Sequence, residues 1–334
     1  MKYLLGIDQG GTKTAALVCD INGNILGTGY ENGLVDVYFN DKEEIYIKRI
    51  ITASVKACTM AGTTLKDISS ICCGLNGADW DFEYPILTKR LLTAFNSKDV
   101  LVLNDCIAAM RGNGGNLIKE CAVVCAGTGL NAAIRRCDGK EIIFGYFIDN
   151  AHQGASALGA NALKKIMEAY LGICKDTSLT GLILDFTGHD SAKDLLMDIT
   201  SGKYRLDFKL LAPLLLKAYA AGDYEAVNIV KRFTYEVAQY ITAGMRRLDM
   251  SGSNLDIIFS GSVFKSVGTG VAERIFNCIS KSEPCVRMIH ARYEPVCGTV
   301  LTLLDKEWGE VLPDKVITAF DKSAEVHGLL RNLK

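Results

Sequence analysis

The sequence predicts an α/β fold of two domains, each built on a β-hairpin-plus-helix core, with a ligand cleft between them. Three observations support this prediction. The 334 residues are enough for two domains of roughly 100–200 residues each. Short β-rich segments alternate with helical patterns along the chain, which is typical of α/β layers. A unit of three strands joined by glycine turns also occurs twice, at an offset of 116 residues.

The repeat places the boundary between the domains near residue 116. We expect an N-terminal domain over residues 1–116 and a C-terminal domain over 117–334, whose last helices pack back on the first domain. At the offset of the repeat, Gly11-Thr12 corresponds to Gly127-Thr128. Further matching pairs are Ala16 and Ala132, Gly23 and Gly139, Gly29 and Gly145, and Tyr30 and Tyr146. Ligands commonly bind between the halves of such a duplicated fold.

The composition predicts an ample core and gives no sign of a charged partner. With 49% hydrophobic and 22% charged residues, the chain is neither disordered nor fibrous. Lys and Arg number 37 and Asp and Glu 38, so the net charge of −1 argues against nucleic-acid or membrane-surface partners. No segment has the ~18 uncharged apolar residues of a membrane helix, and the N-terminus has no signal-peptide pattern. We therefore expect a cytoplasmic protein.

Twelve cysteines is a high number for a chain of this length. No two of them form a C-x-x-C pair, and the four histidines do not cluster with them, so metal ligation has little support. Most lie in apolar runs such as Cys121–Cys125. We expect reduced cysteines that serve as small core residues.

In the first half of the chain, three strands precede a helix. The apolar patterns predict strands over Tyr3–Asp8, Thr14–Asp20 and Asn24–Tyr30. Asn22-Gly23 predicts a type I′ turn between the last two, since that turn needs a positive φ at both central residues. The remaining elements are a helix over 42–61, a strand over 70–75, a helix over 84–96, a strand over Val100–Asp105 and a helix after it.

In the second half, the same three-strand unit comes first. Strands are predicted over Cys121–Cys125, Asn131–Arg136 and Lys140–Tyr146, with Asp138-Gly139 in the hairpin turn between the last two. Long helical patterns follow over 154–171, 207–221 and 223–249. The set ends with a strand over Asp256–Ser260, a helix over 264–280, a strand over Val286–Ile289, a helix over 296–308 and helical residues after Pro313.

The first candidate phosphate site is the turn after the first strand, with the sequence Asp-Gln-Gly-Gly-Thr-Lys-Thr from Asp8 to Thr14. Glycines let backbone N–H groups approach an anion closely, and threonine hydroxyls can donate to phosphate oxygens. Asp8 would repel a phosphate directly, so its carboxylate makes sense through a bridging cation such as Mg²⁺ and its waters. The pattern is neither a Walker loop nor G-x-G-x-x-G. The residues expected to bind phosphate and the cation are Asp8, Gly10, Gly11, Thr12 and Thr14.

The second candidate phosphate site is the corresponding turn of the repeat, Gly127-Thr128-Gly129. Its backbone N–H groups and its hydroxyl can hold phosphate oxygens in the same way. A single G-T-G is a weak signal, but its place opposite the first turn in a duplicated fold makes it a strong one.

Asp105 is the candidate catalytic base. It follows an apolar strand and opens a helix, so it can cap that helix and also face a cleft. A carboxylate between a bound phosphate and a substrate hydroxyl can accept the hydroxyl proton during phosphoryl transfer.

The segment Ser260-Gly261-Ser262 is a candidate contact for a nucleoside. It follows a buried strand and opens a helix. Glycine at this place allows flat contact with a nucleobase or a ribose.

Together these motifs resemble the BadF/BadG/BcrA/BcrD-type ATPase family, on its N-acetylglucosamine kinase-like branch, within the superfamily of sugar kinases, actin and Hsp70 chaperones. The order Asp-x-Gly-Gly-Thr-x-Thr, Asn-Asp-x-x-Ala-Ala, Ala-Gly-Thr-Gly and Ser-Gly-Ser-Val-Phe carries the resemblance. Gly74–Asp79 matches the branch's G-L-x-G-x-D element, and Pro295–Gly298 matches its P-x-x-G-A element, with Thr299 in place of Ala. The resemblance extends from residue 1 to about 308.

The resemblance implies two ribonuclease-H-like (actin-like ATPase) domains around an ATP cleft. It implies Mg²⁺-dependent transfer of the γ-phosphoryl group of ATP to a hydroxyl of a hexosamine-type sugar, and a homodimer. Asp105 would be the general base, and Gly261 and Ser262 would lie near adenosine. The residues expected on the sugar are Asp36, Asn76, Gly77, Asp79, Asp105, Tyr146, His152 and Gln153.

Three departures from the family pattern bear on the substrate. Asp36 stands where the family usually has an Asn that contacts the sugar, and a carboxylate only accepts hydrogen bonds. His152 and Gln153 replace the two acids of a G-D-E-G-S element, and Leu130 stands where Ser is common. We therefore expect an active kinase with a non-standard acceptor, an amino sugar or a sugar derivative, with N-acetylglucosamine itself left open.

Other functions stay open from the sequence. The family name also covers ATP-driven activators of reductases and dehydratases, which hold a 4Fe–4S cluster with cysteines of two subunits, but their D-I-G-G-Q-D element is absent here. A catalytically impaired sugar or nucleotide sensor would fit the altered acids, although Asp8 and Asp105 are present. The zinc-bearing ROK sugar kinases are a nearer rival, but their C-x-C-G-x-x-G-C and E-x-G-H motifs are missing.

Overall fold

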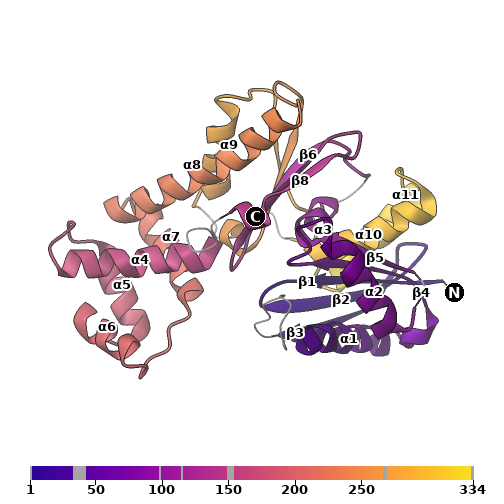
Figure 1. Ribbon diagram of the computed structural model, residues 1–334, viewed down its shortest axis with the longest axis horizontal. Helices are drawn as coiled ribbons and strands as arrows, with labels where there is room; N and C mark the ends of the chain where they lie inside the picture. Colours follow the sequence, from indigo (N-terminus) through magenta and orange to yellow (C-terminus); the bar gives the residue numbers. More distant parts are fainter. Residues whose placement is uncertain are drawn as a thin grey trace. The chain divides into compact units, whose positions relative to one another are not determined.

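The computed structural model describes residues 2–32, 43–97, 99–113, 116–148, 154–265 and 269–331. The chain divides into two compact units, coloured along the sequence in Figure 1. The first unit comprises Met1–Val123, Ala133–Gly145 and Ile289–Lys334. The second unit comprises Val124–Ala132 and Tyr146–Met288. In the described ranges, no helix is both long and apolar enough to cross a membrane.

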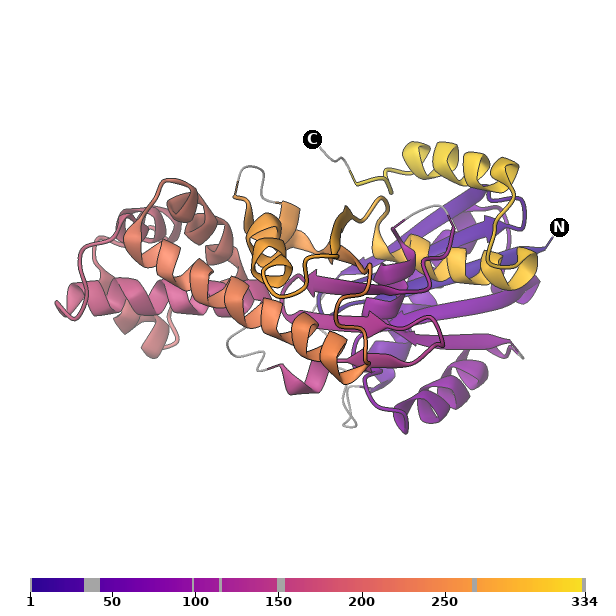
Figure 2. The same ribbon diagram turned by 90° about the horizontal axis from the view of Figure 1, so that it is seen from above.

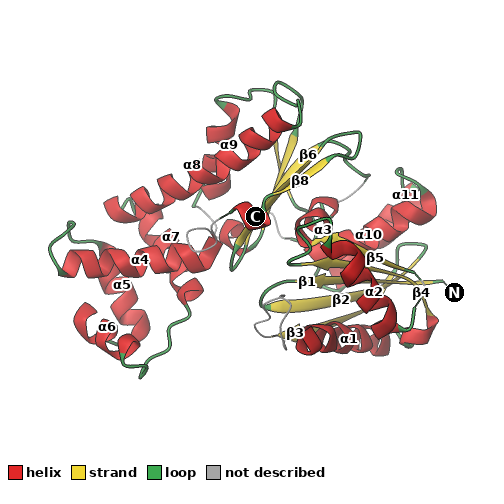
Figure 3. Cartoon of the chain, in the orientation of Figure 1, coloured by secondary structure: helices red, strands yellow, loops and turns green. Residues whose placement is uncertain are grey.

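The first unit contains a sheet of five strands in the order β3-β2-β1-β4-β5, shown in yellow in Figure 3. The strands are β1 Tyr3–Gln9, β2 Lys13–Asp20, β3 Ile25–Asn32, β4 Ile68–Leu75 and β5 Val100–Asn104. β1, β4 and β5 are parallel, whereas β2 runs antiparallel to both β1 and β3. The carboxyl ends of β1, β3, β4 and β5 therefore share one edge of the sheet, which we call the carboxyl edge.

Helices cover both faces of this sheet (Figure 1). α1 (Glu43–Met60) and α2 (Glu83–Phe95) pack on one face, where Leu5 and Ile7 of β1 are buried. α10 (Pro295–Trp308) packs on the other face, in the same apolar cluster as Leu4. Alternate residues of a strand point to opposite faces, so β1 contributes to both cores.

Two helices far apart in the sequence complete the first unit. α3 (Asp105–Arg111) contacts α10, and α11 (Asp314–Val326) lies beside the first strands, as Figure 2 shows. The approach of α10 is close because Gly298 has no side chain: a Cβ there would lie 1.8 Å from the carbonyl oxygen of Ala108. The P-x-x-G element is thus a helix-packing element in this chain.

A second sheet of five strands has the order β10-β9-β6-β7-β8. Its strands are β6 Cys121–Ala126, β7 Leu130–Arg135, β8 Glu141–Ile143, β9 Asp256–Ser260 and β10 Arg287–His290. The boundary between the two units passes through β6, β7 and β10. β7 and β8 form an antiparallel pair, as β2 and β3 do in the first sheet.

The second unit also holds most of the helices. They are α4 Gly154–Tyr170, α5 Ser178–Thr187, α6 Ala192–Thr200, α7 Ala212–Ala220, α8 Tyr224–Arg247 and α9 Val271–Ser280. Short 3₁₀ helices of this unit lie at Phe208–Leu211 and Ser262–Lys265; of the other two described, Leu65–Asp67 belongs to the first unit and Gly145–Phe147 crosses the boundary. α4 contacts α5, α6, α7 and α8, and α8 contacts α9.

The two hairpins of the repeat have the same turn geometry. Asp20 N donates to Asn24 O at 3.0 Å, and Gly23 N donates to Asp20 O at 3.1 Å. The equivalent bonds, 116 residues on, join Arg136 with Lys140 and with Gly139, both at 2.9 Å. Both glycines have a positive φ, of 86° and 87°. These shared bonds support the duplication that the sequence predicts.

The predicted type I′ turn at Asn22-Gly23 is wrong in detail. Among the described residues other than glycine, a positive φ occurs only at Asn96 and Asp249, so Asn22 does not adopt the left-handed conformation that type I′ requires. The side chain of Asp20 accepts hydrogen bonds from the backbone N–H groups of Asn22 and Asn24, both at 2.9 Å. These two hydrogen bonds to the Asp20 side chain stabilise a turn in which Asn22 does not have a positive φ.

The prediction that cysteines serve as core residues is confirmed for seven of the twelve. Seven are buried, three are half-buried and two are exposed, and none forms a disulfide. The buried ones are Cys19, Cys58, Cys72, Cys73, Cys106, Cys121 and Cys297.

Candidate functional site

The carboxyl edge of the first sheet brings together the polar residues that follow β1, β4 and β5. Asp8 is the penultimate residue of β1, and Asp105 directly follows β5. Asn76, which follows β4, donates its backbone N–H to Gln9 O at 2.9 Å and so ties the ends of β4 and β1 together. Gly11 lies next to it, since a Cβ there would be 3.4 Å from Asn76 Nδ2.

Asp8 has an unusual electrostatic environment. Burial and the nearby carboxylates of Asp105 and Glu294 raise the pKa of Asp8 to about 7, against smaller opposite effects of Lys13 and Arg331. Asp8 therefore lies in a region of negative potential, to which the Asp105 and Glu294 carboxylates contribute.

These surroundings fit a divalent cation, because its charge would offset the repulsion and oxygen ligands suit Mg²⁺. In the described part of the chain, no three His, Cys, Asp or Glu side chains are arranged as a complete metal site. A cation at Asp8 would therefore take most of its ligands from water and phosphate, which is how Mg²⁺ is usually bound.

The turn between β1 and β2 corrects the role expected for Thr14. Its side chain is 1% exposed, and its hydroxyl donates to Gln9 Oε1. Gln9 Nε2 in turn donates to Gly10 O at 2.9 Å, and Gly10 N donates to Lys13 O at 2.9 Å. Thr14 therefore stabilises the turn from within and does not present its hydroxyl to a ligand, whereas Thr12 is only half-buried.

The helix cap expected of Asp105 belongs to its neighbour. Asn104 is the N-cap of α3, and its Oδ1 accepts a hydrogen bond from Cys106 N at 2.8 Å. Asp105 is the first residue of the helix, and its Oδ1 is buried. Asn104 also donates from Nδ2 to Asp79 Oδ1 at 2.5 Å and to Ala78 O at 3.2 Å. The sequence reading overlooked Asn104, although Asn is among the strongest N-cap residues.

The element Gly74–Asp79 forms a fixed turn beside Asp105. Gly77 has a φ of +84°, which favours glycine. Glu83 Oε2 accepts hydrogen bonds from Asp79 N and Trp80 N, both at 2.9 Å. Gly145 packs against the carboxylate of Asp79, since a Cβ at Gly145 would lie 2.5 Å from Oδ2. Asp79 is thus held by contacts within the first unit.

A cavity of about 250 Å³ opens beside Asp79 and Asn104. Arg135 Nε donates to Glu141 Oε1 at 2.6 Å on its wall. The other lining residues are Asp81, Tyr84, Leu103, Ile107 and Ile143.

The second glycine turn is joined to the start of α4. Ala155 N donates to Gly127 O at 2.9 Å, and Ser156 N donates to Thr128 O at 3.0 Å. Gly127 N donates to Gly129 O at 3.0 Å, so the turn closes on itself. Among the described residues, no atom would lie within 4 Å of a Cβ on Gly127, which leaves open space between them on that side of the backbone.

Gly261 lies next to the second glycine turn. Its φ is +111°, and a Cβ there would lie 2.2 Å from the carbonyl oxygen of Ala126. Ser262 then begins the short 3₁₀ helix to Lys265. The two glycine motifs of the second unit are therefore in direct contact, which the sequence alone does not indicate.

Several residues predicted to contact the sugar cannot be placed among the described residues. Asp36, His152 and Gln153 lie outside the described residues, as does the side chain of Tyr146. Leu130, the third departure from the family pattern, is buried at the start of β7.

Comparisons with known proteins agree with this arrangement. The model of the BadF/BadG/BcrA/BcrD ATPase family matches residues 5–302. An N-acetylmuramic acid/N-acetylglucosamine kinase of Clostridium acetobutylicum is 25% identical over 306 residues, which cover 90% of this chain and 98% of the relative.

Solved structures establish the fold. A candidate N-acetylglucosamine kinase of Chromobacterium violaceum has a TM-score of 0.66 at 21% identity. The match covers 91% of this chain and 99% of the chain of that kinase. A ROK family glucokinase of Streptomyces griseus, in complex with glucose and AMPPNP, has a TM-score of 0.61 at 18% identity. The match covers 90% of this chain and 97% of the glucokinase chain. The predicted α/β class is confirmed, and its strands form two sheets of five.

Proposed function

Because the chain belongs to the BadF/BadG/BcrA/BcrD ATPase family, we propose that it is an ATP-dependent sugar kinase that phosphorylates a hydroxyl of a hexosamine-type sugar. The observation that carries the proposal is the electrostatic coupling of Asp8 and Asp105 at the carboxyl edge of the first sheet. One carboxylate suits a cation that accompanies phosphate, and the other suits the proton of an acceptor hydroxyl.

On the nucleotide side, Asp8 would hold Mg²⁺ through water, and the backbone of Gly10, Gly11 and Thr12 would bind phosphate oxygens. The cation neutralises charge on the phosphates when bound. In the second unit, Gly127, Thr128 and Gly129 would form the other phosphate loop. Gly261 and Ser262, which directly adjoin that loop, would contact adenosine.

In the transfer step, Asp105 would accept the proton of the sugar hydroxyl. The hydroxyl oxygen forms the new bond to the γ-phosphorus, the bond between that phosphorus and the β-γ bridging oxygen breaks, and ADP leaves. Asn104 fixes the start of α3 and therefore the backbone from which Asp105 projects. Catalysis would depend on positioning and on charge rather than on a covalent intermediate.

The proposed acceptor is an amino sugar or a derivative of one. The relative from Clostridium acetobutylicum is named for N-acetylmuramic acid and N-acetylglucosamine, and both are hexosamine derivatives. Asn76, Gly77, Asp79 and Tyr146 are the residues proposed on the sugar side, together with Asp36, His152 and Gln153. A homodimer, a cytoplasmic location, an inter-domain cleft and a domain boundary near residue 116 stay predictions.

The test is ADP release from Mg·ATP with a panel of acceptors. The panel contains N-acetylglucosamine, glucosamine, N-acetylmuramic acid, N-acetylmannosamine, glucose and no sugar. We expect ADP release that depends on one of the amino sugars or their derivatives. Equal release without any sugar would contradict the proposal and indicate an ATPase. An anaerobic sample with absorbance near 400 nm would instead support the iron–sulfur activator.

A further inference from the structure

A buried ion pair joins the carboxyl end of α3 to α10. Arg111, the last residue of α3, donates from Nε to Asp305 Oδ2 at 2.5 Å and from Nη2 to Asp305 Oδ1 at 2.8 Å. The side chains of Arg111 and Asp305 are 3% and 12% exposed. Two parallel bonds between a guanidinium and a carboxylate fix the direction of both groups as well as the distance between them.

This ion pair supplies geometry more than stability. The desolvation of a buried pair offsets most of its attraction, and apolar residues of similar volume often serve a fold equally well. The cost is higher here, because Nη1 of Arg111 is also buried and has no hydrogen-bond partner among the residues that the structure describes. What the pair adds is a fixed orientation of α3 relative to α10.

Two other contacts of α3 do not fix its rotation about its own axis. The bond from Cys106 N to Asn104 Oδ1 lies within the first turn, so it turns with the helix. In the middle of the helix, Ala108 O faces Gly298, and the two backbones meet there without a side chain between them. Such a contact sets the separation of two helices, whereas interlocking side chains set their orientation.

A rotation of α3 would displace Asp105. The helix has seven residues, or about two turns, with Asp105 at one end and Arg111 at the other, so both ends turn together. Side-chain tips lie roughly 5 Å from a helix axis, so a rotation of about 20° moves the Asp105 carboxylate by about 2 Å. A misplacement of about 1 Å in a catalytic arrangement can lower the rate ~10²-fold.

We propose that Arg111 is a positioning residue for the reaction: its paired bonds to Asp305 fix the rotation of α3, and with it the direction from which the Asp105 carboxylate meets the acceptor hydroxyl. The inference rests on the proposed role of Asp105 as the general base. Neither Arg111 nor Asp305 belongs to the motifs that carry the family resemblance.

A purely structural role makes a different prediction. In that case Arg111→Gln would lower the free energy of unfolding and leave the turnover of the folded protein unchanged. Two variants serve as controls. Lys306→Gln removes the neighbouring ion pair of α10, an exposed pair with Asp99 at 2.9 Å. Asp223→Asn weakens a helix cap in the second unit and so lowers stability far from α3.

The experiment measures kcat and the KM of Mg·ATP by coupled ADP release, with the panel sugar that gives the fastest release. The temperature is one at which every variant is folded. We expect Arg111→Gln to lower kcat about tenfold with little change in KM. Both controls should keep the wild-type kcat. Arg111→Lys keeps the charge but loses the paired geometry, so its kcat should lie between those of Arg111→Gln and the wild type.

A double-mutant cycle with Asp105→Asn shows whether Arg111 acts through Asp105. Once residue 105 no longer accepts the proton, its direction has no effect on proton transfer. Arg111→Gln should therefore not lower the residual turnover of Asp105→Asn any further. A similar fall in both backgrounds would overturn the inference, because Arg111 would then act on something other than Asp105.

A second variant keeps the inference testable if Arg111→Gln does not fold. Arg111→Met combined with Asp305→Leu replaces the buried pair by apolar residues, which proteins often tolerate without loss of stability. We expect this protein to fold and to have a kcat about tenfold below that of the wild type.

The outcomes separate the inference from the proposed function. Wild-type kcat in folded Arg111→Gln, or in the apolar double variant, would overturn the inference and leave the kinase proposal intact. A wild-type chain that releases no ADP with any sugar of the panel would overturn both. Full turnover in Asp105→Asn would overturn the assignment of the base, and the inference with it, but not the kinase proposal.

Discussion

Asn104 joins Asp79 to the first turn of α3. Its Nδ2 donates to Asp79 Oδ1 at 2.5 Å, while its Oδ1 accepts from Cys106 N at 2.8 Å. Asn is suited to both bonds, because its amide carries a donor and an acceptor. A single fully buried side chain therefore fixes the turn after β4 and the helix that begins with Asp105.

We expect Asn104→Asp to cost more stability than Asn104→Ser. Both variants keep the cap and lose the bonds from Nδ2 to Asp79 and to Ala78 O, but aspartate also places a second carboxylate against Asp79 in a buried place. The loss should be about 3 kcal/mol for Asn104→Asp and about 1–2 kcal/mol for Asn104→Ser. Urea denaturation at pH 7 measures both, and equal costs would show that a second carboxylate beside Asp79 adds no penalty.

The cap shows where the sequence reading reached its limit. Asn104 and Asp105 are both good N-cap residues, and their order in the sequence does not tell which of them leaves the helix. The strand ends at Asn104, so that residue has the extended backbone that a cap requires, and Asp105 is the first residue of the helix. The place of the helix was predictable, but the identity of its cap was not.

We expect Asp105→Asn to separate nucleotide binding from catalysis. The amide cannot accept the hydroxyl proton, so turnover should fall by ~10²-fold or more, while the Kd of Mg·ATP changes little. Coupled ADP release and titration calorimetry measure the two quantities. Asp314→Asn, an exposed carboxylate in the first turn of α11, serves as the control. Full turnover in Asp105→Asn would show that another group accepts the proton.

We expect Gly298→Ala to destabilise the first unit. The new Cβ would lie 1.8 Å from Ala108 O, so α10 and α3 must move apart, at a cost of about 1–3 kcal/mol. The matched control is Gly181→Ala in α5, where no atom of the residues that the structure describes lies within 4 Å of the added Cβ. Alanine there should stabilise the helix by about 0.5–1 kcal/mol. If urea denaturation shows that both variants stabilise the protein, or that both destabilise it, the packing argument is contradicted.

In other parts of the site, too, the sequence predicts local patterns but not the contacts that arise only in the folded structure. Both glycine turns were predictable, because a strand that ends in glycines is a local pattern. The partner of the Thr14 hydroxyl was not, since Gln9 reaches it from across the turn. The place of Arg331 beside Glu294 depends on where α11 packs, which no local pattern of the last residues indicates.

The helices of the second unit that the sequence reading left out, α5 and α6, also have capping signals. α5 begins after Thr177, whose side chain accepts from Leu179 N, and ends at Gly188 with a φ of +69°. Its apolar run contains a glycine and β-branched residues, so periodicity alone did not identify it.

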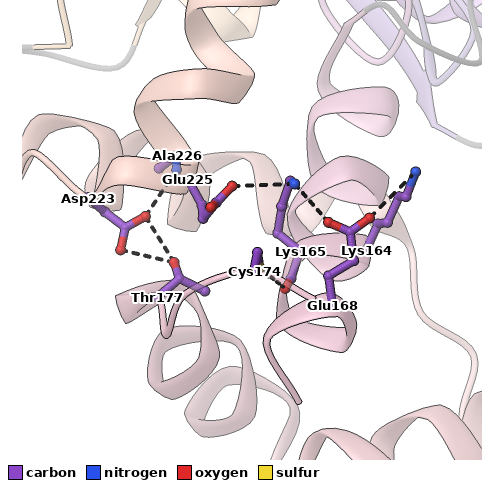
Figure 4. Close-up of polar contacts among 8 residues, drawn as sticks. All are labelled: Lys164, Lys165, Glu168, Cys174, Thr177, Asp223, Glu225 and Ala226. Atoms are coloured by element: carbon purple, nitrogen blue, oxygen red, sulfur yellow. Dashed lines mark hydrogen bonds and ion pairs between the residues drawn. The ribbon is translucent and has the colours of Figure 1, made fainter. Parts of the chain in front are cut away.

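Asp223 holds the starts of two helices together, as Figure 4 shows for Thr177 and Ala226. Its Oδ1 accepts from Ala226 N at 3.0 Å and caps α8, while its Oδ2 accepts from Ser178 N at 2.8 Å at the start of α5. Burial alone would raise the pKa of Asp223, but these hydrogen bonds and those from the hydroxyls of Thr177 and Ser178 hold it below its ordinary value of 3.8.

The depressed pKa of Asp223 fixes the sign of its effect on stability. A carboxylate with a lowered pKa in the folded state stabilises the protein above its unfolded pKa, and this stabilisation is lost as the pH falls through the folded value. We therefore expect Asp223→Asn to lower the free energy of unfolding by about 1–2 kcal/mol at pH 7. The difference from wild type should narrow once the pH falls below 3.8.

Urea denaturation of wild type and Asp223→Asn between pH 7 and pH 3 measures this dependence. Asp207→Asn is the matched control, because Asp207 caps only the short 3₁₀ helix Phe208–Leu211 through a 3.3 Å bond to Lys209 N. Its loss should stay within about 0.5 kcal/mol at every pH. A cost for Asp223→Asn that is the same at both ends of the range would mean that the shape of the side chain, and not its charge, connects α5 to α8.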